Sequence, residues 1–215
     1  MTEFIISGLL AIAAYFLGSI PTGYLLGRYL QGIDIREHGS GSIGATNVLR
    51  TLGKKAAIAV LTLDLLKGSL AVALVSLVIS IEATEVPGSW QPWLETGAAI
   101  AAVVGHSKSI WINLTGGKSV ATSLGVLLVM NPIVALGTLA VFLIVLALSR
   151  IVSLSSISGA IAVNVFMILL QQPLPYMLFA GLVGIYITWR HRSNIGRLLA
   201  GTEPQIGKKL QQEET

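Results

Sequence analysis

The chain has 215 residues, of which 53% are hydrophobic and only 11% are charged, with a formal net charge of +4. Soluble domains carry about 25% charged residues, so a soluble fold of this length would expose too much apolar surface to water. This composition, with a mean hydropathy of +0.79, argues against a soluble enzyme, a nucleic-acid-binding module and a disordered chain. It predicts an all-α integral membrane protein. The chain has no cysteine, which excludes disulfides, a thiolate nucleophile and a cysteine-based metal site.

Apolar runs that could cross a bilayer recur along the chain, and a spanning helix needs about 20 such residues. The runs cover 4–27, 56–81, 94–105, 120–130, 133–148, 151–170 and 175–189. We therefore expect seven transmembrane helices, of which 94–105 and 120–130 are short and either tilted or placed where the bilayer is thin. Five spans with a re-entrant pair is the alternative. Pro21 is expected to kink the first helix, which lacks the basic start of a signal peptide and is read as a retained span.

The placement of charge predicts the orientation. Seven spans make one membrane domain over 1–215, with loops on one side at about 31–55, 106–119, 149–157 and 190–215. All 14 Lys and Arg residues fall in or near these loops. The other side carries acidic residues without Lys or Arg, namely Glu3, Glu82, Glu85 and Glu95. The positive-inside rule then places the N-terminus outside and the C-terminus in the cytoplasm. Tryptophans mark the outer interface (Trp90, Trp93) and the inner interface (Trp111, Trp189).

The first cytoplasmic loop contains Gly39-Ser-Gly-Ser-Ile-Gly44, which has the form G-x-G-x-x-G. A dinucleotide-binding unit would need a preceding strand, and a transmembrane helix is expected there instead. Glycines still allow consecutive backbone N–H groups to converge on an anion. The loop adds hydrogen-bonding side chains and one bidentate donor: Ser40, Ser42, Thr46, Asn47 and Arg50. The alternative is a flexible connector.

The second loop ends in Gly116-Gly117-Lys118-Ser119, directly before an apolar helix. It is not a P-loop, because Ile112 stands where that motif needs glycine. The helix N-terminus offers free N–H groups and partial positive charge, and the lysine adds a full charge. We expect a second phosphate cradle here. The alternative is a glycine hinge whose lysine reaches the membrane interface.

Polar residues gather at three further places. Arg150 is followed by Ser153, Ser155 and Ser156, which predicts either a topology anchor or hydroxyl donors for a polar substrate. After the last span, His191 and Asn194 are three residues apart and share a helical face, which an anchor does not need. Within the second span, Asp64 and Lys67 also share a face. Charged residues within a membrane span usually indicate function. The alternative is that Asp64 and Lys67 form an ion pair with each other near the end of the helix that water reaches.

These segments favour an anionic substrate, and phosphate fits best. The cations that converge on the cytoplasmic face are Arg50, Lys118, Arg150, Arg190, Arg192 and Arg197. Two separate glycine-rich loops suggest two phosphate groups. No His, Asp and Glu cluster has metal-ligand spacing, and no covalent nucleophile is evident. The pattern therefore favours an already activated donor, with catalysis by positioning and charge stabilisation.

The motifs resemble the bacterial acyl-phosphate:glycerol-3-phosphate acyltransferase family (PlsY-type). They are Gly-Ser-Gly-x-x-Gly-Ala-Thr-Asn-x-x-Arg at 39–50, Gly-His at 105–106, Gly-Gly-Lys-x-Val-Ala-Thr at 116–122 and His-Arg-x-Asn-Ile-x-Arg-Leu at 191–198, with Gly-Ser-Ile-Pro-Thr-Gly at 18–23. The resemblance implies transfer of a fatty acyl group from acyl phosphate to the 1-hydroxyl of glycerol 3-phosphate. The products are lysophosphatidic acid and phosphate. It also implies a monomer in the bacterial cytoplasmic membrane, with no cofactor and no metal.

The resemblance also assigns residues. The residues expected to bind the phosphate of the acyl phosphate are Gly116, Gly117, Lys118, Ser119 and Thr122. The residues expected to bind glycerol 3-phosphate are Arg50, His191 and Asn194. The rest of the pocket is expected from Ser40, Thr46 and Asn47, with His106, Ser155, Ser156 and Arg192. The general base is left open between His191, His106 and the departing phosphate.

Two positions depart from the family pattern, which usually has Asn at Ser42 and Gly at Ser119. A side chain at 119 disfavours a positive φ there. Two rival functions remain at this point. One is a membrane transporter for a phosphorylated solute, although no clear inverted repeat is visible. The other is a membrane scaffold that only binds anionic lipid headgroups.

Overall fold

The computed structural model describes residues 2–81 and 86–207, in which helices joined by loops occur and no β-strand is present. The expectations for Glu82 and Glu85 lie outside the described residues. The helices are α1 (Thr2–Ser19), α2 (Thr22–Gln31), α3 (Ala45–Thr51), α4 (Lys54–Ser80), α5 (Gln91–Ser107), α6 (Val120–Met130), α7 (Pro132–Ser149), α8 (Val152–Leu169), α9 (Leu174–Arg190) and α10 (Arg192–Leu199).

The predicted apolar runs lie in helices, apart from a break at residues 20–21 and single residues at the ends of two runs. Within the described residues, four helical segments are long and apolar enough to cross a membrane: Thr2–Gln31, Lys54–Ser80, Pro132–Ser149 and Val152–Leu169. Helices α5 and α9 have 17 residues each. The expected short helix is α6, whose 11 residues extend about 16 Å, roughly half of a bilayer core. The all-helical membrane class is therefore confirmed.

The first predicted span is broken rather than kinked. Helix α1 ends at Ser19 and α2 begins at Thr22, so Ile20 and Pro21 lie between two helices. Proline cannot donate a backbone hydrogen bond, so the α-helical pattern is interrupted: the Leu17 carbonyl accepts from the Ile20 N–H at 3.3 Å and the Ile20 carbonyl from the Thr22 N–H at 3.0 Å. Lys67 on α4 donates from Nζ to the Ile20 carbonyl at 2.8 Å. The break is thus stabilised by a charged residue 47 positions away.

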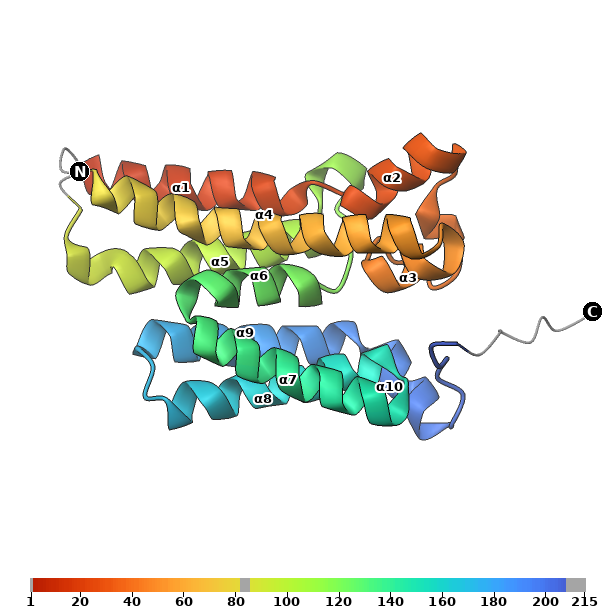
Figure 1. Cartoon of the computed structure of the whole chain (residues 1–215). Coiled ribbons are helices and arrows are strands. Elements are labelled where there is room, and N and C mark those ends of the chain that lie inside the picture. Colours follow the sequence, from red (N-terminus) through yellow and green to blue (C-terminus); the bar gives the residue numbers. More distant parts are fainter. Residues whose placement is uncertain (1, 82–85, 208–215) are drawn as a thin grey trace, which may run out of the picture.

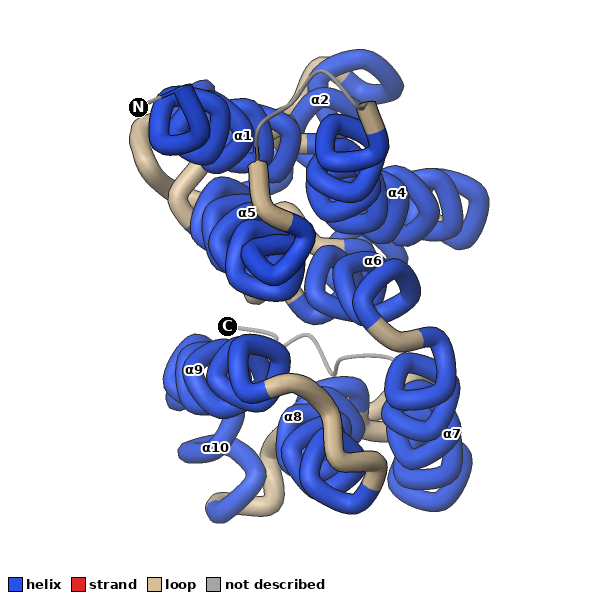
Figure 2. Tube along the Cα trace, turned by 90° about the vertical axis from the view of Figure 1, so that its left-hand side faces the viewer, coloured by secondary structure: helices blue, strands red, loops and turns tan. Residues whose placement is uncertain are grey.

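The helices form two packed groups, as Figure 1 and the end-on view in Figure 2 show. In one group α1 packs against α5, and α4 packs against α5 and α6. In the other, α8 packs against both α7 and α9. Contacts of α5 with α9 and of α6 with α7 join the groups. The segment between α2 and α4, the segment between α5 and α6, and the residues after α9 lie at the end opposite the N-terminus (Figure 1).

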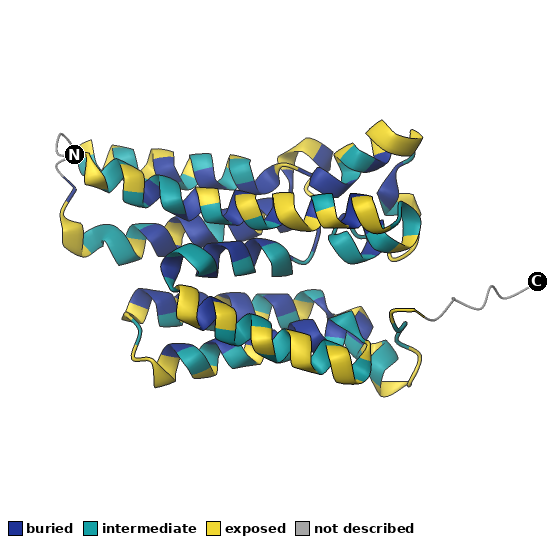
Figure 3. Ribbon diagram, viewed as in Figure 1, coloured by how far each residue is buried: buried dark blue, intermediate teal, exposed yellow. Residues whose placement is uncertain are grey.

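The outer faces are apolar along their length, and exposed residues recur along α4 and α7 in Figure 3. Leu148 and Ile185 are 83% and 72% exposed. Lipid can cover such side chains at no cost, whereas water cannot. The core between the two groups contains small and β-branched side chains as well as an aromatic one, with Val126, Val134 and Phe179 buried together.

Helices α4 and α6 approach closely through glycine. A Cβ on Gly68 would overlap the Thr122 carbonyl oxygen, and a Cβ on Gly125 would overlap the Leu65 carbonyl oxygen. Small residues allow this approach of two backbones in a membrane bundle. The contact fixes the short helix α6, and with it the loop that ends at Ser119, against α4.

Candidate functional site

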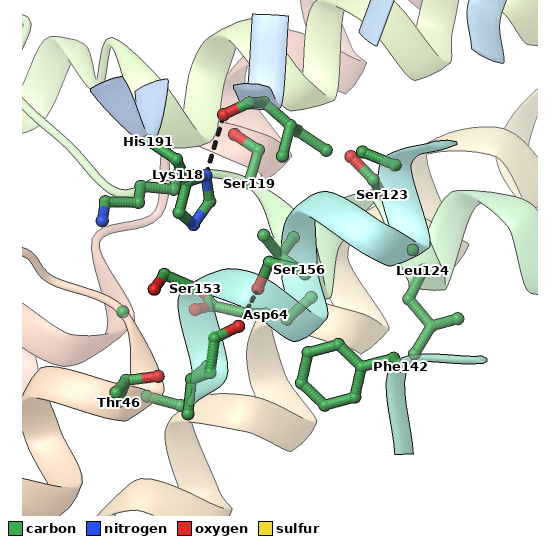
Figure 4. Close-up of a pocket in the computed structure, with 18 of the residues that line it drawn as sticks. Thr46, Asp64, Lys118, Ser119, Ser123, Leu124, Phe142, Ser153, Ser156 and His191 are labelled. Carbon is green, nitrogen blue, oxygen red and sulfur yellow. Dashed lines mark hydrogen bonds between the residues drawn. The ribbon is translucent and has the colours of Figure 1, made fainter. Parts of the chain in front are cut away.

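A cavity of about 540 Å³ lies between the two helix groups. Its lining is polar at one end and apolar at the other. Figure 4 shows Thr46, Lys118 and His191 at the polar end, and Leu124 and Phe142 at the apolar end. A cavity of this kind suits a ligand with a charged head and a hydrocarbon tail.

The loop before α3 is held in shape by Asn47. Its Oδ1 accepts a hydrogen bond from the Ser40 N–H at 2.8 Å. Its Nδ2 lies 2.8–3.0 Å from the carbonyl oxygens of Ile35, His38 and Ser42. Asn47 is buried, so its side chain supplies the hydrogen bonds that water cannot supply to these backbone groups. The arrangement presents Ser40, Thr46 and Arg50 along the cavity wall.

Some of the N–H groups in the two glycine-rich loops are hydrogen-bonded within the protein. In the first loop Gly41 N–H donates to the His38 carbonyl at 3.1 Å, and Gly44 N–H lies 3.3 Å from the Ser42 hydroxyl. In the second loop Gly117 N–H donates to the His106 carbonyl at 3.1 Å. These bonds shape the loops, and the anion nests stay a prediction for the other loop N–H groups, beside the side chains and the N-terminus of α6.

Arg190 fixes the second loop from the other helix group. Its guanidinium donates to the carbonyl oxygens of Gly116 and Gly117 at 3.1 Å and 2.8 Å. Because those carbonyls are oriented toward Arg190, the loop is joined to the end of α9. Sequence reasoning noted the charge of Arg190 but did not assign it to the site.

Ser119 adopts the positive φ that its side chain was expected to disfavour. Its φ is 62°, in the left-handed region, where it caps α6. The hydroxyl lies 2.6 Å from the Ser107 hydroxyl and donates to the Val103 carbonyl at 2.8 Å. These buried hydrogen bonds offset the backbone strain, which is of order 1 kcal/mol for a non-glycine residue.

Lys118 reaches the cavity between both helix groups. Its amine donates to Oδ1 of Asn194 on α10. Burial lowers the pKa of Lys118 to about 8, and the nearby Arg197, Arg190 and Arg50 add to this while Glu203 opposes it. A partly buried ammonium among other cations attracts a multiply charged anion, because the anion relieves both effects.

His191 and Asn194 come together at the cavity, but not on one helical face, because His191 lies at the junction between α9 and α10 and only Asn194 is within α10. Both are buried and both line the cavity. Burial, then the charge of Lys118, lowers the pKa of His191 to about 4, so its imidazole is neutral at pH 7. Its Nδ1 lies 2.8 Å from the Ile187 carbonyl, which makes Nδ1 the protonated nitrogen and leaves Nε2 an acceptor.

Glu203 is a cavity residue that the sequence analysis did not assign. Its Oε1 accepts from Ser153 at 2.7 Å and from Asn194 at 2.6 Å, and its Oε2 accepts from Arg197 at 2.7 Å. Burial raises the pKa of Glu203, but these hydrogen bonds outweigh burial and hold the pKa below its usual value. The carboxylate therefore stays ionised and fixes Asn194, which contacts Lys118.

The serines on α8 divide according to helical phase. Ser153 and Ser156 line the cavity, whereas Ser155 does not. The hydroxyls of Ser155 and Ser156 donate to the carbonyls of Ile151 and Val152, each at 2.8 Å. The i,i+3 spacing of Ser153 and Ser156 is the signal that could have selected this pair.

Several predicted site residues lie behind the cavity wall or away from it. Gly116, Gly117 and Thr122 are not among the lining residues, and Thr122 is buried against Gly68. Arg192 lies on the outer surface, with its guanidinium 4.7 Å from the centre of the Trp189 ring. Asp64 and His106 do line the cavity. The predicted Asp64–Lys67 pair forms, at 2.9 Å.

Comparisons with known proteins identify the family of this chain. The family model described as glycerol-3-phosphate acyltransferase matches residues 8–201. The chain is 67% identical to glycerol-3-phosphate acyltransferase of Crocosphaera subtropica over 98% of both chains. It is 59% identical to the one of Synechocystis, over 94% of this chain and 91% of that protein.

Two solved structures of PlsY, an integral membrane glycerol 3-phosphate acyltransferase, share the fold. The glycerol 3-phosphate form has a TM-score of 0.85 and 38% identity, and covers 94% of this chain and 96% of its own. The lysophosphatidic acid form has a TM-score of 0.82 and 38% identity, with 94% and 95% covered. The family expected from the motifs is thus confirmed, and the chain belongs to the glycerol-3-phosphate acyltransferase family.

Proposed function

We propose that this enzyme transfers a fatty acyl group from acyl phosphate to the 1-hydroxyl of sn-glycerol 3-phosphate. The products are lysophosphatidic acid and inorganic phosphate, the first acylation in phospholipid synthesis. The observation that carries the proposal is one continuous cavity, which joins a cationic end at Lys118 and Arg50 to an apolar end at Leu124 and Phe142. The solved relatives were obtained in a glycerol 3-phosphate form and a lysophosphatidic acid form, which supports this substrate and product.

The donor phosphate lies against Lys118 and the first turn of α6. The leading N–H groups of a helix lack intrahelical acceptors, and Val120 and Ala121 of that turn line the cavity. Ser119 lines the cavity beside this turn, and Gly116, Gly117 and Thr122 support the cradle from behind. The acyl chain extends between α7, α8 and α9, past Phe142.

Glycerol 3-phosphate lies at the mouth, with its phosphate near Arg50 and its hydroxyls near His191 and Asn194. Ser40 and Thr46 add hydroxyl groups there, while Asn47 holds their loop. The neutral imidazole of His191 offers Nε2 as an acceptor for the attacking hydroxyl. Its depressed pKa makes it a weak base, so it orients the hydroxyl rather than retaining the proton.

In the reaction, the 1-hydroxyl oxygen attacks the carbonyl carbon of the mixed anhydride. The new ester C–O bond forms, and the bond from that carbon to the phosphate oxygen breaks. The hydroxyl proton leaves with inorganic phosphate, whose oxygens are stronger bases than His191. Lys118 stabilises the charge that develops on the departing phosphate. An activated donor removes the need for a covalent acyl-enzyme.

The membrane arrangement follows from the same charges. Seven helices, α1, α4, α5, α6, α7, α8 and α9, cross the bacterial cytoplasmic membrane. The N-terminus is outside and the active site faces the cytoplasm, which is supported by the gathering of Lys and Arg in the loops on one side of the predicted spans. The enzyme acts as a monomer, as the family resemblance implies.

The test is a purified-enzyme assay with palmitoyl phosphate and glycerol 3-phosphate, following both phosphate release and lysophosphatidic acid. We expect equal amounts of the two products, and no product when palmitoyl-CoA replaces the acyl phosphate. Product from palmitoyl-CoA alone would overturn the donor assignment. Uptake of glycerol 3-phosphate into liposomes without acylation would restore the transporter alternative, which the comparisons do not favour.

A further inference from the structure

A buried cluster of polar and charged side chains lies under the loop that carries Lys118. Its members are Thr22 on α2, Asp64 and Lys67 on α4, and His106 on α5, with 5%, 1%, 4% and 3% of their surface exposed. Buried charges are expensive in a membrane bundle, so a cluster of this kind requires a reason. The proposed reaction does not use Asp64, Lys67 or Thr22.

One carboxylate oxygen joins three helices. Oδ1 of Asp64 accepts from the Thr22 hydroxyl at 2.5 Å and from Nζ of Lys67 at 2.9 Å. Nδ1 of His106 lies 3.6 Å from the same oxygen. Lys67 in turn donates to the carbonyl of Ile20, in the break between α1 and α2. Asp64 is therefore the common contact of α2, α4 and α5.

His106 carries this contact to the second loop. Its carbonyl accepts from the Gly117 N–H at 3.1 Å. A Cβ on Gly117 would overlap Nε2 of the imidazole, so the ring and the glycine backbone touch. Within the described residues, Nδ1 has no hydrogen-bond partner, and Asp64 is the charge that it faces. A carboxylate near Nδ1 favours the proton on that nitrogen and fixes the orientation of the ring.

We propose that Asp64 is a positioning residue, which orients His106 so that the imidazole holds Gly117 and thereby aims Lys118 into the cavity. Lys67 and Thr22 fix the carboxylate in turn. Two contacts link Asp64 to the loop: Asp64 faces His106, and His106 touches Gly117. Gly117 directly precedes Lys118, so its position affects where the lysine points. The inference rests on the proposed function in one respect, namely that Lys118 holds the donor phosphate.

A purely structural ion pair makes a different prediction, because a buried pair can be replaced by neutral groups without loss of stability. The test is the double variant Asp64→Asn with Lys67→Gln. It leaves no unpaired charge, retains an acceptor for Thr22 and retains a donor for Ile20. We expect its melting temperature in detergent to stay near that of the wild type. We expect kcat/KM for palmitoyl phosphate to fall about tenfold or more, with KM for glycerol 3-phosphate unchanged within roughly twofold.

His106→Asn provides a second variant that does not disturb the ion pair. It should show the same selective loss, and the triple variant should be no worse than either parent, because coupled residues are not additive. Glu95→Gln is the matched control, since Glu95 is also a buried carboxylate, bonded to Ser76 at 2.8 Å and absent from the cavity lining. It should leave both kinetic parameters unchanged.

The inference is overturned if the double variant, or His106→Asn, keeps wild-type kcat/KM for the donor. It is also overturned if activity falls only in proportion to the melting temperature, or if the two losses add fully. An inactive wild-type enzyme with palmitoyl phosphate would instead overturn the proposed donor. The two failures are therefore distinguishable.

Discussion

The side-chain amine of Lys118 donates a hydrogen bond to the side-chain oxygen of Asn194, although the two residues are 76 positions apart. This contact bridges the two helix groups across the polar end of the cavity. Glu203 accepts from the amide of the same Asn194 at 2.6 Å. The cation that would meet the donor phosphate is thus aimed by a residue that a carboxylate holds in place.

Replacement of Lys118 by alanine should abolish turnover while the protein still folds and inserts. The variant removes the ammonium but no packing contact of the helices, so its melting temperature should change little. The loss should be at least about a hundredfold in kcat/KM, typical of removing a charge that stabilises a leaving group. The measurement is phosphate release by purified enzyme. Activity like that of the wild type would refute the assignment of Lys118.

The pH profile should report the same residue. With its pKa lowered to about 8, Lys118 is charged below that pH and loses its proton above it. We therefore expect kcat/KM for the acyl phosphate to fall as the pH rises through about 8. Lys118→Arg should be less active overall but lack this fall, because a guanidinium stays charged to above about pH 12. A flat wild-type profile, or the same fall in both enzymes, would contradict this prediction.

Glu203→Gln should reduce activity about tenfold, because the charge-assisted bonds to Asn194 and Arg197 weaken and Lys118 loses its support. The variant should also be less stable. Since the pKa of Glu203 is below its usual 4.5, its contribution is present above about pH 4.5 and declines as the pH falls further. The difference in melting temperature between wild type and variant should narrow over that acid range. The control is Glu37→Gln at an exposed loop residue.

The sequence predicted the helices better than it predicted the contacts at their ends. Apolar runs mark the helix bodies because lipid requires them, and α7 and α8 differ from the expected runs by one residue at either end. The break at Pro21 could not be distinguished from a kink, because it depends on the distant Lys67. Local periodicity carries no information on such long-range partners.

The candidate site shows the same division. His191 and Asn194 were found because a three-residue spacing is a local signal, although His191 lies at the junction of α9 and α10 rather than on the helix of Asn194. Glu203 was missed because its partners Ser153 and Arg197 lie on different elements. The glycine-rich loops were predicted as anion nests, and the N–H groups of Ser40, Gly41 and Gly117 are hydrogen-bonded within the protein, which only the folded loop reveals.

Ser119 offers a test of how strain and hydrogen bonding combine. Ser119→Gly should change stability little, since it relieves the positive φ but loses the bonds to Ser107 and Val103. Ser119→Ala keeps the strain and loses the same bonds, so it should cost about 1–3 kcal/mol. Thermal unfolding in detergent should rank wild type and glycine above alanine. An alanine variant as stable as the glycine variant would show that the φ strain is negligible.

Two arginines separated by one residue should differ sharply. Arg190 donates to the carbonyls of Gly116 and Gly117, whereas Arg192 stacks on Trp189 at the outer surface. Their roles diverge because α9 ends between them, so the chain changes direction at His191. Arg190→Gln should lower kcat/KM for the donor about tenfold, because the second loop loses its contact with α9. Arg192→Gln should retain activity within roughly twofold. If both variants lost the same activity in the phosphate-release assay, Arg192 would also belong to the active site. If both kept wild-type activity, Arg190 would have no role there.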